Sequence, residues 1–346
     1  MEAELKEEEL QINNVNSDNI INKQETQLDL SGNDIVESKN EVVESKNEIA
    51  DRKPEEIATT KFPRIQSPSS INTFKQCPRK YYYHYIEKLE SLPSIHLVRG
   101  KLTHSVLEDF FLVNVEHLNQ DSFMFDLRII IMELFKKHWQ ANLEEMEKLG
   151  LTKQELDFYK QETKYMVEIW VKRFIHNVAE DMNSSVSTSI TPLTFKEAIS
   201  RHTPKTEEEY RSNIHGVRGF IDAIHEYENE INGQIKKEVH VIDYKTSKRA
   251  KMSPEYKLQL AIYAMLYEEK HGILPNKVGL DFLKFDEGPM CIDADRDLVE
   301  FAIKEISLIH ENTKSKNKKD YRKQISALCK WHSGQCDFYD LCKDED

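Results

Sequence analysis

Val239-His-Val-Ile-Asp-Tyr-Lys245 is an apolar stretch that ends in a carboxylate and an ammonium group. Side chains alternate along a strand, so Asp243 and Lys245, two positions apart, point to the same face. A carboxylate at the end of a buried strand can hold a divalent cation, and a neighbouring lysine can orient or deprotonate water. The Asp-x-Lys pattern is common, however, so further residues elsewhere in the chain are needed to indicate whether this copy is catalytic.

The composition is that of a folded protein with a long polar segment. The chain has 346 residues, 39% of them hydrophobic and 32% charged, which suffices for one large domain or two smaller ones with a core. No stretch approaches the roughly 18 apolar residues that span a bilayer. The first residues lack the basic start and apolar run of a secretory signal. These features predict an intracellular, cytoplasmic protein without a membrane segment.

The acidic charge is concentrated at the start of the chain. Residues 1–60 carry 16 acidic and 6 basic side chains and no aromatic residue, whereas the whole chain has a net charge of −13. Such a segment buries too little apolar surface to offset chain entropy, so we expect a disordered acidic tail over residues 1–60 and a folded domain over residues 61–346. The folded part is nearly neutral, and a nucleic-acid ligand is therefore not excluded.

Hydrophobic periodicity predicts an α/β fold with helices on both sides of a central sheet. Gly100 is expected to break the chain before a new helix, and Gly150 to Thr152 interrupts a helical segment. A helical insertion or subdomain is expected over about 112–190. The strands are predicted at 194–199, 217–226, 237–244 and 277–285, and the later helices at 253–271 and 295–310.

Other polar residues are candidates for the same site. Asp222 lies among apolar residues, where a carboxylate is costly unless it is paired or metal-bound, although a turn or sheet-edge position would also explain it. His104 lies one helical turn before Glu108 and can share its face, but a lone histidine is often structural. Gln259 and Tyr263 share a helical face, where they complete a site or form a plain surface pair.

Together these residues resemble a known family. Gly100…His104, Gly219-Phe-Ile-Asp222, Asp243-Tyr-Lys-Thr246 and Gln259-Leu-Ala-Ile-Tyr263 stand in the order found in the PD-(D/E)xK nuclease superfamily. The pattern is most similar to the RecB-like branch, which includes CRISPR-associated adaptation nucleases and the AddB nuclease domain. The resemblance covers roughly residues 65–346. It implies a restriction-endonuclease-like core with a central mixed sheet flanked by helices.

The resemblance also implies a role for each matched residue. It assigns His104, Asp222 and Asp243 as ligands of Mg²⁺ or Mn²⁺, with the backbone carbonyl of Tyr244 as a further ligand. Lys245 would position and activate water and offset charge on phosphorus. Gln259 and Tyr263 would complete the catalytic group. The implied activity is a metal-dependent deoxyribonuclease, an exonuclease on single strands or DNA ends.

The five cysteines suggest a second metal site. In a reducing compartment, the odd number and the grouping at the C-terminus favour metal ligation over disulfides. The stretch from Phe74 to Tyr82 resembles the entry motif of iron–sulfur members of the same branch. By that resemblance the ligands of a [4Fe-4S] cluster are Cys77, Cys329, Cys336 and Cys342.

One spacing departs from the family pattern. The last three cysteines read Cys-x6-Cys-x5-Cys, where the branch usually has Cys-x2-Cys-x5-Cys. Zinc, with His332 replacing a cysteine, and unligated thiols therefore remain open alternatives. Cys291 lies apart from this group, and we expect a plain buried thiol there.

The implied substrate is DNA, single-stranded or with free ends, in repair, recombination or CRISPR adaptation, with a helicase or an adaptation protein as partner. Two basic runs, residues 314–323 and 245–251, contact phosphates or are solvated loops. The tyrosines at 81–85 stack bases or pack beneath the cluster. The alternatives to a nuclease are a single-strand or junction DNA-binding subunit with a structural cluster, and a zinc-stabilised scaffold that docks through its tail.

Overall fold

The computed structural model describes residues 62–345 except 93, 184–192, 232–233 and 332–333. These residues belong to a single unit, Ala58–Asp346, that is distinct from Met1–Ile57. The predicted tail lies outside the described residues, so its disorder and the boundary at residue 61 stay predictions. No helix in the described ranges is long and apolar enough to cross a bilayer.

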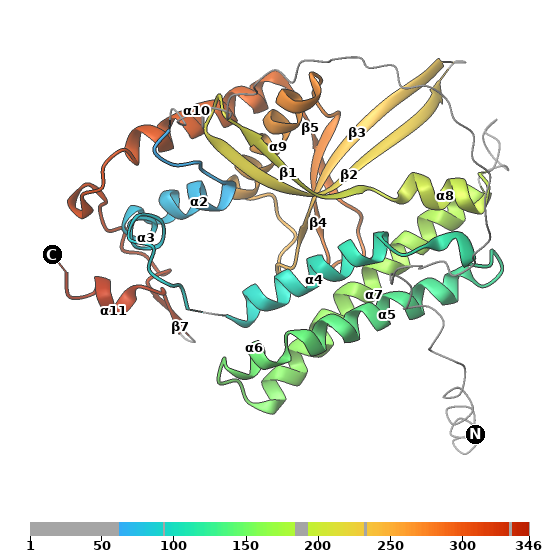
Figure 1. The fold of residues 1–346 in the computed structure, drawn as a ribbon, viewed down its shortest axis with the longest axis horizontal. Coiled ribbons are helices and arrows are strands. Elements are labelled where there is room, and N and C mark those ends of the chain that lie inside the picture. The colour runs from blue at the N-terminus through green and yellow to red at the C-terminus, as the bar shows by residue number, and fades with distance from the viewer. Residues whose placement is uncertain (1–61, 93, 184–192, 232–233, 332–333, 346) are drawn as a thin grey trace, which may run out of the picture. The chain divides into compact units, whose positions relative to one another are not determined.

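A five-stranded mixed sheet forms the centre of the fold (Figure 1). Its strands lie in the order of the sequence, and every neighbouring pair is antiparallel except β3 and β4, which are parallel. The strands are β1 (Lys205–Ser212), β2 (Val217–Ile231), β3 (Gln234–Lys245), β4 (Lys277–Phe282) and β5 (Met290–Asp293). The parallel pair is joined by a helical crossover, as parallel strands require.

Helices cover both faces of the sheet, which confirms the predicted α/β class. One face packs against α9 (Pro254–His271) and α10 (Arg296–Asn312), with α2 (Pro68–Gln76) beside them. The other packs against α4 (Ile95–Phe111), α5 (Phe123–Ala141), α7 (Lys153–Asn183) and α8 (Phe195–His202), with the short α6 (Leu143–Glu147) and η4 (Val115–His117) between them. Burial of each large apolar side chain in these two cores contributes about 1.5–3 kcal/mol.

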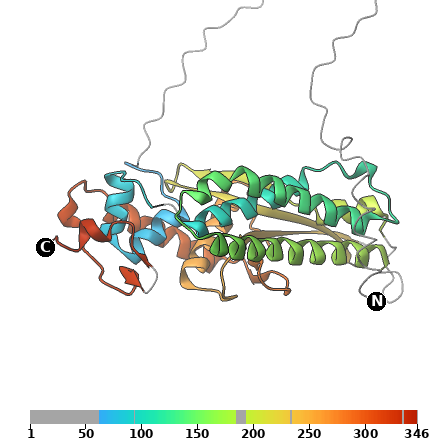
Figure 2. The same cartoon turned by 90° about the horizontal axis from the view of Figure 1, so that it is seen from below.

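The two ends of the described chain lie side by side in both views (Figures 1 and 2). Buried Tyr81, Tyr82 and Tyr83 pack against Tyr321 and Phe338, so residues far apart in sequence share one small core. The elements that form this end are α3 (Pro78–Tyr81), the π-helical turn η3 (Tyr82–Ile86), η6 (Lys318–Asp320), β6 (Lys330–Trp331), β7 (Gly334–Gln335) and α11 (Tyr339–Cys342). This packing brings the first cysteine close to the last three.

The structure corrects the prediction of a strand at 194–199. This segment is the start of α8, because Thr194 accepts a hydrogen bond from the Glu197 amide while the Glu197 carboxylate accepts one from the Thr194 amide. This reciprocal capping box stabilises the helix start despite the β-forming residues that follow it.

The predicted break at Gly100 is also wrong, because α4 continues through it from Ile95 to Phe111. A Cβ at Gly100 would lie 3.7 Å from Oγ1 of Thr246, which is ordinary van der Waals contact. The helix thus passes close to the loop that follows β3. Position 100 does not end a helix here but lies on its face toward that loop.

Candidate active site

β3 divides its side chains between the two cores. Val239 and Val241 point into the core with α9, whereas Ile242 and Tyr244 pack in the core with α4 and α7. Asp243 follows the first set, and its side chain contacts groups of α9. Only 2% of Asp243 is exposed, so its carboxylate lies at the floor of the site. The strand alternation predicted from the sequence is therefore present at the positions that matter.

Asp222 joins the site from the neighbouring strand. The register of β2 with β3 runs from Ile231–Gln234 to Ala223–Ile242, and Asp222 lies just beyond that last pair. Its Oδ2 accepts a hydrogen bond from the backbone amide of Tyr244 at 2.7 Å. Asp222 is 8% exposed, and the bond compensates part of the cost of burying its carboxylate.

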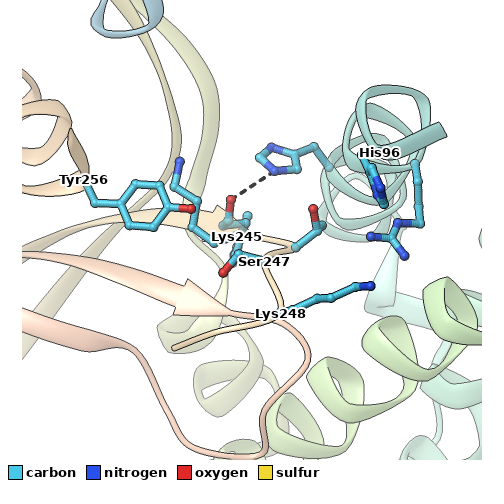
Figure 3. Close-up of a pocket in the computed structure, with 9 residues that line it drawn as sticks. His96, Lys245, Ser247, Lys248 and Tyr256 are labelled. Atoms are coloured by element: carbon cyan, nitrogen blue, oxygen red, sulfur yellow. Dashed lines mark hydrogen bonds between the residues drawn. The ribbon is translucent and has the colours of Figure 1, made fainter. Parts of the chain in front are cut away.

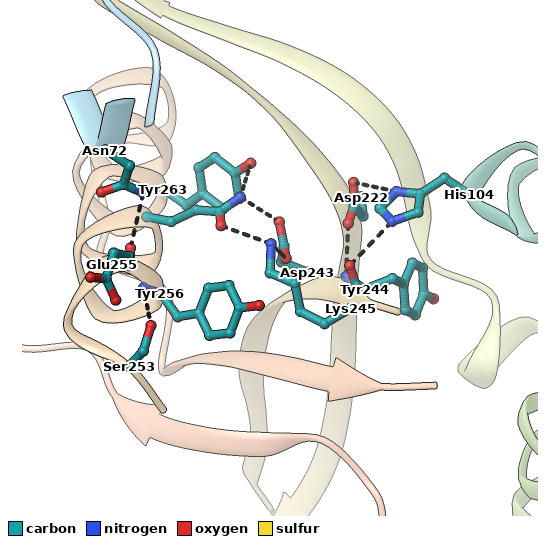
Figure 4. A network of polar contacts seen from close by, with 11 residues as sticks. Asn72, His104, Asp222, Asp243, Tyr244, Lys245, Ser253, Glu255, Tyr256 and Tyr263 are labelled. Atoms are coloured by element: carbon teal, nitrogen blue, oxygen red, sulfur yellow. Dashed lines mark hydrogen bonds and ion pairs between the residues drawn. The ribbon is translucent and has the colours of Figure 1, made fainter. Parts of the chain in front are cut away.

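His104 reaches the same strand end from α4 (Figure 4). Its Nδ1 lies 3.3 Å from Oδ1 of Asp222, and its Nε2 lies 3.1 Å from the carbonyl oxygen of Tyr244. Burial alone would lower the pKa of His104, but the hydrogen bond and charge of Asp222 outweigh it and raise the pKa to about 9. The imidazole is therefore surrounded by oxygen ligands of the kind that also hold a cation.

α9 supplies the opposite side of the network. Gln259 Oε1 accepts from Lys245 Nζ at 2.8 Å, and Gln259 Nε2 donates to Oδ1 of Asp243 at 2.7 Å. The same Nε2 lies 2.9 Å from the hydroxyl of Tyr263. Burial would lower the pKa of Lys245, but the charge of Asp243 raises it above its ordinary value. Lysine and carboxylate are thus fixed relative to each other by one amide side chain.

A glycine makes room for this arrangement. Gly219 on β2 faces the ring of Tyr263, and a Cβ there would lie 2.8 Å from Cε1 of that ring. Any side chain at this position would displace the tyrosine. The glycine of the Gly-x-hydrophobic-Asp motif is therefore explained by its packing against Tyr263.

The structure brings together every residue of the predicted catalytic set. Oxygen, imidazole and ammonium groups from four elements meet at the carboxyl end of β3: His104 from α4, Asp222 from β2, Asp243, Tyr244 and Lys245 from β3, and Gln259 and Tyr263 from α9. Their individual roles remain predictions. The sequence predicted which residues share the site, but their separations follow from the pairing of β2 with β3 and from the packing of α9.

The donor set suits a hard divalent cation. Two carboxylates, a backbone carbonyl and an imidazole are ligands that Mg²⁺ and Mn²⁺ accept. Oδ2 of Asp243 forms an ion pair with Lys245 Nζ at 2.5 Å and makes no other polar contact that meets hydrogen-bond geometry with a described residue. As the side chains stand, no group of three or more His, Cys, Asp or Glu in the described ranges has the arrangement that holds a metal ion. The residue types therefore fit a divalent cation, while the Asp243 carboxylate points toward Gln259, which donates a hydrogen bond to it.

The four predicted cluster ligands line a second cavity, of about 360 Å³. Cys77 precedes α3, and the amide of Cys336 donates to the carbonyl of Cys329 at 2.9 Å across the β6–β7 hairpin. All of these thiols are free of disulfides. Cys336 and Cys342 also pack against the tyrosine core, and burial raises the pKa of both thiols.

Positive side chains surround the cysteine cavity. Arg79, Lys80, Lys323 and Lys343 line it together with the thiols, and such charges offset those of thiolates. The four cysteines therefore share one cavity, although as the side chains stand they do not form a metal-binding group among the described residues. His332, the alternative zinc ligand, lies outside the described residues, so the choice between iron–sulfur and zinc stays open.

Three further predictions can be compared with the structure. Tyr81, Tyr82 and Tyr83 are buried in the core beneath the cysteines, so they are packed rather than open to bases. In the basic run, Lys318 pairs with Glu345 at 2.7 Å, so this lysine has an internal partner. Cys291 lies on β5 and is only half-buried. The plain buried thiol expected there is therefore partly accessible.

The sequence did not reveal one charged group near the site. Arg99 on α4 and Lys284 after β4 both contact Glu162 on α7. Arg99 lines a cavity of about 520 Å³ together with His104, Tyr244 and Lys245. Arg99, Glu162 and Lys284 come from distant parts of the chain, and only their packing in the fold identifies them as a group.

Comparison with known proteins agrees with this geometry. The family model for the PD-(D/E)XK nuclease superfamily matches residues 66–343. A solved structure called "Putative exonuclease", from Eubacterium rectale, has a TM-score of 0.43 and 11% identity over 82% of this chain and 94% of that one. No curated protein matches the sequence. The match over most of the chain, with the matching α/β fold, identifies the protein as a member of the PD-(D/E)XK nuclease superfamily.

Proposed function

We propose that the protein is a metal-dependent deoxyribonuclease of the RecB-like branch that acts as an exonuclease on single strands or DNA ends. One observation carries the proposal. Two carboxylates, Asp222 at 8% and Asp243 at 2% exposure, are buried beside a lysine and a histidine at one strand end. Burying two adjacent carboxylates is costly, and such arrangements concentrate at functional sites.

In this proposal the residues divide into cation ligands and a water-orienting group. His104, Asp222, Asp243 and the carbonyl of Tyr244 would hold Mg²⁺ or Mn²⁺. When bound, the cation would polarise a phosphoryl oxygen and lower the pKa of water. Lys245 would orient the attacking water and offset negative charge on the phosphorus.

Gln259 would act as the positioning residue for this lysine. Its amide oxygen accepts from Lys245 while its amide nitrogen donates to Asp243, so the ammonium and the carboxylate keep a fixed separation. Tyr263 contacts the same amide nitrogen and restricts its rotation. A water molecule bound by Lys245 would therefore have one preferred position.

We further propose that Cys77, Cys329, Cys336 and Cys342 hold a [4Fe-4S] cluster. The shared cavity and the surrounding cations support this, and a cluster of this kind would belong in a reducing, cytoplasmic compartment. Cluster binding would tie the start of the domain to its end. Between Cys329 and Cys336, the residues of β6 and β7 pair antiparallel, so the longer spacing need not separate the two thiols.

The biological setting rests on the branch resemblance. It favours DNA repair, recombination or CRISPR adaptation, with a helicase or an adaptation protein as partner. The domain would comprise residues 61–346, with residues 112–190 as its helical insertion and 329–342 as its C-terminal cysteine segment.

Cleavage of labelled DNA tests the proposal. The purified full-length protein is incubated with 5′-labelled, 3′-labelled and circular single strands in Mn²⁺, in Mg²⁺ and in EDTA. We expect metal-dependent cleavage of the linear strands and none of the circle. Cleavage of the circle would reject the exonuclease assignment. Intact strands in both metals, with the protein still bound to DNA, would reject the nuclease in favour of a binding subunit.

A further inference from the structure

The larger cavity opens beside the catalytic network, between the start of α4 and the loop after β3 (Figure 3). Its volume is about 520 Å³. His96 and Arg99 line it from α4, and Thr246, Ser247 and Lys248 line it from the loop. Because His104, Tyr244 and Lys245 also line it, a group held here would lie next to the reacting centre.

The cavity wall carries an excess of positive charge. Arg99 is only 2% exposed, and the side chain of Lys284 behind it is 10% exposed. Both contact the same carboxylate: Arg99 forms an ion pair with Glu162, and Lys284 Nζ lies 2.5 Å from Glu162 Oε1. One carboxylate balances one of the two buried cations, and Lys248 adds another positive charge at the rim.

Part of the Arg99 guanidinium has no hydrogen-bond acceptor. Its Nη1 pairs with Glu162, but its Nε is buried and makes no hydrogen bond with any residue in the described ranges. Leaving such a donor unsatisfied costs about 1–3 kcal/mol, so an acceptor that reached it from the cavity would recover that free energy. The guanidinium offers the fixed, paired donors that match phosphate oxygens.

The charge excess is also felt by neighbouring groups. Burial, with the charges of Arg99 and Lys248, lowers the pKa of Lys284 to about 8. The same charges, after burial, lower the pKa of His96. Burial is the larger cause of both shifts, and the contributions of Arg99 and Lys248 show that these groups lie within electrostatic reach of one another.

A purely structural role for Arg99 explains less. Its contact with Glu162 links α4 to α7, and the ring of Tyr159 lies 5.4 Å from its guanidinium carbon. A link of that kind needs one cation for Glu162, whereas here Lys284 contacts the same carboxylate. Thr246, Ser247 and Lys248 of the loop also line the cavity, and a link between α4 and α7 through Glu162 does not explain their presence there.

We propose that this cavity binds a phosphate group of the nucleic-acid substrate next to the phosphate that reacts. Arg99 and Lys248 contact its oxygens, with Lys284 supplying charge from behind. The inference rests on the proposed nuclease function and deepens it, because a second phosphate would fix the strand relative to Lys245. The phosphate belongs either to the backbone or to a 5′ end, and both present the same kind of oxygen atoms to Arg99 and Lys248.

Binding without cleavage tests the cavity separately from the catalytic activity. Fluorescent single-stranded DNA is titrated in EDTA with the wild-type protein, with Lys248→Ala and, as a matched control, with Lys304→Ala, an exposed lysine on α10. We expect Lys248→Ala to raise Kd about 3- to 10-fold and to reduce the slope of log K against log salt by about 0.7. Lys304→Ala should match the wild type. Equal Kd and slope for all three proteins would overturn the proposal.

Arg99→Gln provides the second variant, and its far-UV circular dichroism spectrum and Tm are recorded first because Arg99 is buried. Each protein is titrated with strands that carry a 5′-phosphate or a 5′-hydroxyl. If the wild type prefers the 5′-phosphate and the variants lose that preference, the cavity holds a terminal phosphate. If both strands weaken equally, it holds a backbone phosphate. These titrations measure binding and not cleavage. A failure of the nuclease assay can therefore be distinguished from a failure of the phosphate-binding proposal.

Discussion

The two polar sites of this protein are built in opposite ways. At the end of β3, the functional groups lie on strands and long helices, and hydrogen bonds join them: Asp222 to Tyr244, and Lys245 to Gln259 to Asp243. The cysteine cavity is enclosed by the end of α2, the four-residue helices α3 and α11, the turn η3, the two-residue strand β7, and loops. The first site takes its geometry from the sheet; the second has little regular structure to hold it.

This difference indicates what each site needs in order to form. Side chains on a sheet with two hydrophobic cores keep their positions without a ligand. A cavity enclosed by short elements depends on a bound group for part of its stability, because binding free energy then becomes folding free energy. We therefore expect changes at β3 to remove activity and leave folding, and changes at the cysteines to do the reverse.

The largest effect is expected from Lys245→Ala. Loss of the ammonium group that orients water should lower the cleavage rate about 10²- to 10⁴-fold, while the fold persists because the sheet is intact. Rates on labelled single-stranded DNA and affinities in EDTA are measured side by side. Lys257→Ala, an exposed lysine on α9, is the matched control and should keep the wild-type rate. A Lys245→Ala rate within a factor of three of wild type would remove the lysine from the mechanism.

A smaller loss of stability is expected from Cys336→Ser. Removing one of four ligands should release the cluster and lower the unfolding free energy by about 3 kcal/mol, which corresponds to a drop in Tm of about 6 °C or more. Visible absorbance, bound iron and Tm are measured on the same samples.

Cys291→Ser is the internal control for this experiment, because Cys291 is a half-buried thiol on β5 outside the cysteine cavity. It should keep the iron content and lose little stability. A colourless wild type that contains zinc would replace the iron–sulfur assignment. Equal behaviour of the two variants would mean that the cavity binds nothing.

The smallest effect is expected from Glu345→Gln, which tests how the C-terminal end is fastened. The hydrogen bond from Lys318, with the charges of Lys318 and Arg79, lowers the pKa of Glu345 to about 2, against 4.5 for an ordinary glutamate. The carboxylate therefore stabilises the fold above about pH 4.5, and this contribution is lost as the pH falls toward 2. At pH 7 the variant should melt about 1–2 °C below the wild type, as expected for a partly exposed ion pair.

The difference in Tm between wild type and Glu345→Gln should shrink as the pH is lowered from 4.5 toward 2. Glu311→Gln, an exposed glutamate on α10, should show no such pH dependence. A Tm difference that stays constant over this range would mean that Glu345 does not carry the ionic contacts.

The comparison also explains what the sequence predicted. β3 was recognisable from an apolar run that ends in the Asp-x-Lys pattern, and α9 from the cap at Ser253 and the proline in its first turn. These two elements position Asp243, Lys245 and Gln259. β1 was missed because Glu208 and Glu209 obscure the period of an edge strand that buries only one face. The edge strand β5 was missed because it has only four residues.

The cation group of the larger cavity had no sequence signal. Arg99, Glu162 and Lys284 are separated by long intervals and meet only after α4 and α7 pack beside the sheet. The alternation of side chains along a strand follows from the local backbone, whereas the contact of Arg99 and Lys284 with Glu162 depends on tertiary packing. Motifs therefore identified the residues that we propose as catalytic but not the cavity beside them.

Mn²⁺ binding tests the central claim most directly, because it reports on the β3 site independently of turnover. Free Mn²⁺ is measured by electron paramagnetic resonance as the purified protein is titrated. Asp222→Asn is compared with Asp297→Asn, an exposed aspartate on α10. We predict that the wild type and Asp297→Asn bind Mn²⁺ alike and that Asp222→Asn binds it about 10-fold more weakly or worse. Identical Mn²⁺ binding by all three proteins would contradict a cation site at the end of β3.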